Sequence, residues 1–112
     1  MNKFSSTHNK GFQMTFDNGF RLSVQWGIGN YCSRKNDGMF GDEMKDNFWE
    51  STSAEIAVFD DNVDSSPMVK LNDGLDMVCG WLNADQVAKV MAIVQSAKTA
   101  NEIELKCKTL NI

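Results

Sequence analysis

Large apolar residues occupy every second position over residues 12–16 and again over residues 20–26. Asp17, Asn18 and Gly19 separate these two stretches. Asn and Gly accept the positive φ angles that tight hairpin turns require. The pattern therefore predicts a β-hairpin made of two antiparallel strands.

Three further stretches have the pattern of strands. Ala54, Ile56 and Val58 alternate with Glu55 and Ala57, and the polar cluster at 60–62 ends this run. Residues 68–71 and 75–81 are short apolar runs on either side of an Asn-Asp-Gly tripeptide. Because such a tripeptide favours a tight turn, the two runs predict a second hairpin.

The C-terminal third predicts a helix followed by a strand. Asn83 stands three residues before Gln86, which is the spacing of a capping box at a helix N-terminus. Apolar residues then recur at helical spacing, so we expect an amphipathic helix over residues 84–99. Residues 103–107 alternate between apolar and charged positions and predict a final strand with one solvated face.

A sheet with one apolar face and a helix with one apolar stripe can bury each other. We therefore expect an α+β fold, with an antiparallel sheet of five to six strands packed on one amphipathic helix in the C-terminal half. The length of 112 residues fits a single domain over 1–112. Residues 1–10 are polar and aperiodic and predict a flexible lead. Residues 27–50 are rich in Gly, Asn, Asp and Ser and predict a long surface excursion.

Hydropathy and cysteine usage bear on the compartment. No stretch approaches the roughly 18 to 20 apolar residues that span a bilayer, and the polar opening lacks the apolar run of a secretory signal. We expect a cytoplasmic protein with no membrane partner. Cys32, Cys79 and Cys107 are odd in number and far apart, which favours free thiols over a disulfide framework.

The charges are unevenly distributed around a net charge of −4. Residues 1–41 hold five basic residues and two acids, whereas residues 42–76 hold ten acids and two basic residues. Such segregation can steer a basic partner, although a solvated acidic face without a partner would have the same composition. Direct nucleic-acid binding ranks last, because phosphate contacts with basic residues supply most of such affinity.

The usual catalytic constellations are missing from the sequence. His8 is the only histidine and lies in the predicted lead, so no His-based zinc site, Cys-His pair or serine triad can form in the core. Residues 60–64 imitate the start of a calcium loop but lack its turn glycine and its closing glutamate. We expect no enzymatic activity, no metal and no cofactor.

Large aromatic residues separate into two groups. Those on the strand patterns are expected mostly in the core; they are Phe12, Phe16, Phe20, Trp26 and Trp81. Those among the charges of the excursion either fasten it to the core or anchor a partner, and binding hot spots favour Trp and Tyr. The candidate partner-binding residues are Tyr31, Arg34, Phe40, Asp42, Glu43, Asp46, Trp49 and Glu50.

Two alternatives to partner binding remain open. A glycine pair after a predicted strand resembles a phosphate-binding loop, but a third glycine and a following helix are missing. The candidate ligand-binding residues of a small-molecule or nucleotide-binding protein are Gly27, Gly29, Asn30, Arg34 and Lys35. The other alternative is a homo-oligomeric structural or assembly accessory built through an edge strand or a helix face.

The block over residues 12–34 resembles a segment of small, mostly uncharacterised proteins encoded by bacteriophages and prophages. The likeness is carried by residues 14–16, Asn18-Gly19, residues 23–25 and residues 29–32. It implies a phage accessory protein that works in the host cytoplasm and inhibits or modulates a host protein, for example one of host defence. The acidic middle segment would then favour a host partner with a basic surface.

Overall fold

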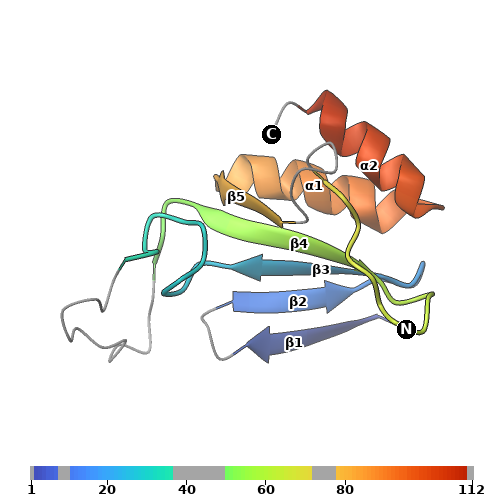
Figure 1. The fold of residues 1–112 in the computed structure, drawn as a ribbon, viewed down its shortest axis with the longest axis horizontal. Coiled ribbons are helices and arrows are strands. Elements are labelled where there is room, and N and C mark those ends of the chain that lie inside the picture. Colours follow the sequence, from blue (N-terminus) through green and yellow to red (C-terminus); the bar gives the residue numbers. More distant parts are fainter. Residues whose placement is uncertain (1, 8–10, 37–49, 72–77, 111–112) are drawn as a thin grey trace.

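The computed structural model describes residues 2–7, 11–36, 50–71 and 78–110, which form an antiparallel sheet of five strands and two helices (Figure 1). The predicted α+β class is therefore confirmed. The elements in chain order are β1 (Lys3–Thr7), β2 (Gly11–Thr15), β3 (Phe20–Gln25), β4 (Ala54–Asp60), β5 (Val78–Leu82), α1 (Ala84–Ser96) and α2 (Ala100–Thr109). The strands lie in the sheet in this same order.

The hairpin predicted over residues 12–26 is confirmed as β2 and β3, which pair from Gly11 with Gln25 to Thr15 with Arg21. At its turn the N–H of Gly19 donates to the carbonyl oxygen of Phe16 over 3.0 Å. Gly19 adopts a φ of +88°, a conformation that costs glycine nothing.

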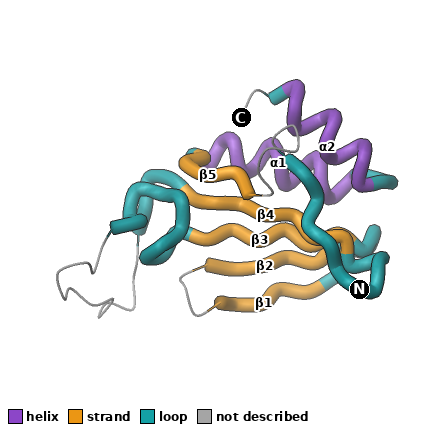
Figure 2. Tube along the Cα trace, viewed as in Figure 1, coloured by secondary structure: helices purple, strands orange, loops and turns teal. Residues whose placement is uncertain are grey.

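Both helices lie on the same side of the sheet, where α1 packs on the strands and α2 packs on α1 (Figure 2). Alternate apolar residues of β3 and β4 point to this face and pack against the apolar stripe of α1. The fully buried members of this core include Leu22, Ile56, Val58, Val90 and Val94. Helix α1 packs on β3, β4 and β5, while β1 and β2 lie toward the sheet edge farthest from β5 (Figure 1).

The predicted helix is confirmed as α1, although it is shorter than expected. The Asn83 side chain accepts a hydrogen bond from the N–H of Gln86, and the Gln86 side chain accepts one from the N–H of Asn83, each over 2.9 Å. The helix ends at Ser96, where Ala97 takes an extended conformation. Its C-terminal carbonyl groups accept hydrogen bonds from Asn18 in the β2–β3 turn.

The prediction of a flexible lead was wrong for residues 3–7, which form β1 at the edge of the sheet. β1 pairs with the whole of β2, from Lys3 with Thr15 to Thr7 with Gly11. The strand is held by its backbone ladder. Phe4 is its only apolar residue and is highly exposed, so no hydrophobic period marks the strand in the sequence.

The prediction of a final strand over residues 103–107 was also wrong, because this segment lies in the second helix, α2. Thr99 caps the helix by accepting a hydrogen bond from the N–H of Glu102 over 3.1 Å. Ile103 and Cys107, four residues apart, are fully buried. Leu105 between them is 56% exposed, which is the behaviour of a helix and not of a strand with three inward residues.

The second predicted hairpin was wrong as well. β5 pairs with β4, with Cys79 opposite Ile56, and residues 68–71 contribute only an isolated bridge between Met68 and Phe59. Both segments therefore pair with successive parts of the same edge of β4. The predicted turn between them falls on residues 72–77, which lie outside the described residues.

Candidate binding surface

The loop over residues 27–36 follows β3 and folds back on itself. The N–H of Gly27 donates to the side-chain oxygen of Asn30 over 3.0 Å, and the N–H of Asn30 donates to the Gly27 carbonyl over 3.2 Å. The N–H of Gly29 donates to the carbonyl of Lys35 over 2.9 Å. Cys32 is fully buried beneath this turn. The first part of the predicted excursion is thus an ordered loop.

Glu55 of β4 fastens this loop to the sheet. Its carboxylate accepts hydrogen bonds from the N–H of Tyr31 over 2.9 Å and from the Asn30 side chain over 3.5 Å. The N–H of Ser33 donates to the hydroxyl of Ser53 over 2.9 Å. These N–H groups, which a bound phosphate would need, are used inside the protein. The small-molecule alternative over residues 27–35 stays a prediction, and these donors give it no support.

Tyr31 and Trp81 lie next to each other at the end of β5. The N–H of Trp81 donates to the carbonyl of Tyr31 over 2.8 Å, and the Nζ of Lys35 lies 5.5 Å from the centre of the Tyr31 ring. Tyr31 is 45% exposed and Trp81 is 57% exposed. A Cβ added at Gly80 would collide with the Cβ of Tyr31, so glycine permits this close approach. We call the surface formed by the exposed rings of Tyr31 and Trp81, with Lys35 beside Tyr31, the aromatic surface.

A backbone irregularity turns Trp81 outward. Ile56 pairs with Cys79 and Ala54 pairs with Leu82, so β5 carries one more residue than β4 between these pairs. Trp81 within this bulge has a φ of +61°, which costs a residue with a side chain about 1–2 kcal/mol. Leu82 takes the buried position instead. The expectation that Trp81 lies in the core was wrong.

Three of the predicted partner-binding residues lie among the described residues. Tyr31 and Arg34 share the 27–36 loop, and Nη1 of Arg34 donates to the carbonyl oxygen of Glu50 over 2.9 Å. The structure therefore brings Tyr31, Arg34 and Glu50 to the same end of the sheet. The other five predicted residues, Phe40, Asp42, Glu43, Asp46 and Trp49, lie outside the described residues. Sequence reasoning missed Trp81, although a glycine inside a strand pattern signals a bulge.

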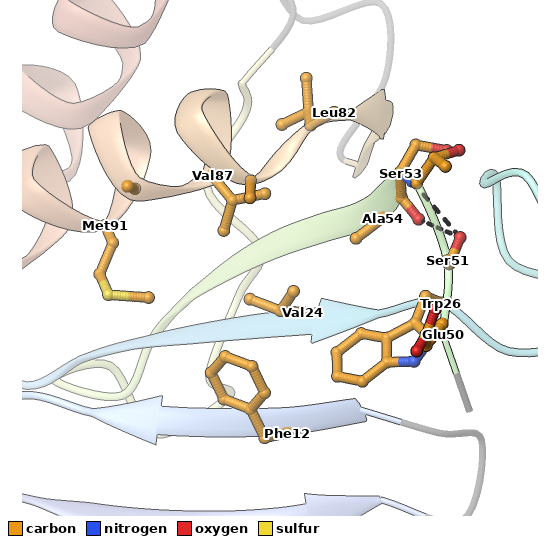
Figure 3. Close-up of a pocket in the computed structure, with 13 residues that line it drawn as sticks. Phe12, Val24, Trp26, Glu50, Ser51, Ser53, Ala54, Leu82, Val87 and Met91 are labelled. Carbon is orange, nitrogen blue, oxygen red and sulfur yellow. Dashed lines mark hydrogen bonds between the residues drawn. The ribbon is translucent and has the colours of Figure 1, made fainter. Parts of the chain in front are cut away.

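A pocket of about 570 Å³ opens beside this end of the sheet, between α1 and strands β2 and β3 (Figure 3). Among the described residues most of its lining is apolar, and residues 50–53 form a polar side. The apolar lining residues are Phe12, Val24, Trp26, Ala54, Leu82, Ala84, Val87, Ala88 and Met91. The rings of Phe12 and Trp26 meet edge to face, with 6.2 Å between their centres.

The opposite face of the sheet carries a polar cluster around Arg21. Its guanidinium donates to the carboxylate of Asp61 over 2.9 Å and to the Gln13 side chain over 2.7 Å, and it lies 4.3 Å from the ring centre of Phe59. The hydrogen bond from Arg21 lowers the pKa of Asp61. This cluster is satisfied internally, which indicates a structural role.

The chemistry-bearing groups of the described residues form no recognisable reactive site. Burial raises the pKa of the Cys79 thiol, and it raises that of Cys107 to about 11, so both thiols are protonated at neutral pH. No group of three His, Cys, Asp or Glu residues in this part of the chain could hold a metal ion. Neither of the described helices is long and apolar enough to cross a membrane.

Comparison with protein-family models, curated proteins and solved structures finds no match to this chain. Its function must therefore be inferred from its own surface and pocket.

Proposed function

We propose that this chain is a non-enzymatic binding protein that recognises a partner protein through the aromatic surface. The observation that carries the proposal is Trp81, a large aromatic held outward at a positive φ beside the exposed ring of Tyr31. A costly backbone conformation that exposes an aromatic residue is typical of a functional site.

The chemistry of the aromatic surface suits protein recognition. Trp and Tyr dominate binding hot spots because each buries a large apolar area at a small cost in side-chain entropy. Two hydrogen bonds, from the N–H of Trp81 to the Tyr31 carbonyl and from the N–H of Tyr31 to the Glu55 carboxylate, fix the backbone of both residues before a partner binds. Such preorganisation reduces the entropy lost on binding.

The class of partner that we propose is supported by the sequence rather than by the described surface. The resemblance of residues 12–34 to phage proteins supports a host protein that the chain inhibits or modulates. The acidic segment 42–76 supports a partner with a basic surface. Next to Tyr31 the described surface carries the basic Lys35 and Arg34 as well as the acids Glu50 and Glu55. The electrostatic part of the proposal therefore rests on the acidic composition of the segment as a whole.

The test is a differential capture from host lysate. Immobilised parent protein is compared with Trp81→Gly and Tyr31→Ala, and with Leu105→Ala as the matched control. Glycine accepts the φ of residue 81, so Trp81→Gly removes the ring without adding backbone strain. Leu105 is as exposed as Trp81 but lies on α2.

We expect a protein that the parent and Leu105→Ala retain and that the two aromatic variants lose. Circular dichroism and thermal melting check that every variant is folded. Equal capture by folded parent and Trp81→Gly would contradict the proposal.

A further inference from the structure

The pocket between α1 and the sheet is separate from the aromatic surface, because Tyr31, Lys35 and Trp81 do not line it. Its volume of about 570 Å³ lies within the range of small-molecule sites, about 300–1,000 Å³. Its polarity is segregated: in Figure 3 Met91, Val87 and Phe12 line one end, and Glu50, Ser51 and Ser53 lie at the other. A ligand that fits this lining has an apolar body and one polar end.

Two residues at the polar end of the pocket, Ser51 and Glu50, offer acceptors. The Ser51 hydroxyl donates its only proton to the carbonyl oxygen of Ser53 over 2.6 Å and accepts a hydrogen bond from the N–H of Ser53 over 3.3 Å. Its remaining lone pair can only accept a hydrogen bond from a ligand. The Glu50 carboxylate is likewise an acceptor only, when it is ionised. Ser51 and Glu50 therefore favour a hydrogen-bond donor at the polar end of the ligand.

The charge of the lining also favours a cationic ligand. Glu50 is exposed and is the only ionisable side chain among the lining residues. Arg34 contacts the backbone carbonyl of Glu50 and is not part of the lining. The N-terminus of α1 at Ala84 would favour an anion, but the Asn83 cap and Asp85 in the first turn counter its partial charge. The ring of Trp26 adds a π face that attracts cations.

We propose that this pocket binds a small amphipathic amine, with its apolar body between α1 and the sheet and its ammonium group beside Glu50 and Ser51. An ammonium group supplies three hydrogen-bond donors and a positive charge, which the acceptors at this end match. The apolar body buries against Phe12, Val87 and Met91, and this burial supplies most of the affinity.

Three probes with the same eight-carbon chain test the proposal by isothermal titration calorimetry at neutral pH: octylammonium, octanol and octanoate. We expect octylammonium to bind about threefold to fivefold more tightly than octanol, which is the range of an exposed charge pair, and octanoate to bind most weakly. Glu50→Gln should remove the preference for octylammonium over octanol while leaving the affinity for octanol unchanged.

A variant that fills the pocket locates the binding site. Ala88 is exposed on α1 and lines the pocket, so Ala88→Trp should block all three probes without unfolding the protein. Leu105→Trp on α2 is the matched control and should bind as the parent does. Absence of octylammonium binding, unchanged binding to folded Ala88→Trp, or equal affinity for octanoate and octylammonium would each overturn the proposal.

Discussion

Asn18 joins the β2–β3 turn to the end of α1 and should be one of the most important polar residues of the fold. Its side-chain amide donates to the carbonyl oxygens of Val94 and Ala97 over 2.8 and 2.9 Å, with Gln95 a third acceptor at 3.2 Å. Its side-chain oxygen accepts a hydrogen bond from the N–H of Phe20 over 3.1 Å. One residue thus satisfies the turn and the helix C-terminus, whose carbonyl groups lack partners within the helix.

Asn18→Ala removes all of these contacts. A hydrogen bond contributes about 1 kcal/mol net, and the amide has two protons and one accepting oxygen in use. We therefore expect the free energy of unfolding to fall by about 2–3 kcal/mol, equivalent to roughly 10–20 °C in melting temperature.

Urea unfolding followed by circular dichroism measures this loss, with Asn101→Ala as the matched control. Asn101 is exposed on α2, so the control should stay within about 0.5 kcal/mol of the parent. A loss of less than 0.5 kcal/mol in Asn18→Ala would refute the assigned role.

Asn18→Asp tests whether the side chain at position 18 must donate hydrogen bonds to the end of α1. A carboxylate at this position would face the carbonyl oxygens and the negative end of the α1 dipole, so the folded protein should raise the pKa of the new Asp above its unfolded value of about 3.9. The protonated carboxyl group can donate one hydrogen bond. Its contribution is present below the unfolded pKa and is lost as pH rises through the folded pKa. Asn18→Asp should be less stable than Asn18→Ala at pH 7, and a reversed order there would contradict the geometry.

Three further predictions test the assignments of α2, the thiols and the bulge. Ile103→Ala should lower the free energy of unfolding by about 2–4 kcal/mol and Leu105→Ala by less than about 0.5, whereas similar losses at both positions in chemical unfolding would favour a strand. Burial raises the pKa of the Cys107 thiol to about 11, so the contribution of the protonated thiol to stability is complete below the unfolded pKa and is lost as pH rises toward 11. Cys107→Ala should therefore reduce the loss of stability at alkaline pH in unfolding experiments. Gly80→Ala should lower stability by about 1–3 kcal/mol in thermal melts, because its Cβ would collide with Tyr31; unchanged stability would place Tyr31 elsewhere.

The elements that could be predicted carry turn or capping residues that agree with their pattern of apolar residues. The β2–β3 hairpin has a glycine at the position of positive φ, and α1 has both members of its capping box. β1 could not be predicted, because an exposed edge strand held by backbone hydrogen bonds needs no apolar period. In α2 the alternation of Ile103, Leu105 and Cys107 is coincidental: only residues four apart are buried.

The candidate site was predictable in part. Tyr31 is exposed in the predicted excursion, at the end of the sheet where Arg34 contacts Glu50. Trp81 could not be placed, because its outward direction depends on a one-residue bulge in the pairing of β5 with β4. A strict alternation through this strand puts Trp81 on the core side, and the extra residue gives that place to Leu82.

The central claim is that Trp81 anchors a partner protein, and the most direct test is the affinity of the purified captured partner for the parent, Trp81→Gly and Leu105→Ala. A hot-spot aromatic contributes about 2 kcal/mol or more, so the dissociation constant for Trp81→Gly should rise by at least about 30-fold. The dissociation constant for Leu105→Ala should match that of the parent. A folded Trp81→Gly whose dissociation constant changes by less than about threefold would contradict the claim, because an anchoring side chain cannot be removed at so small a cost.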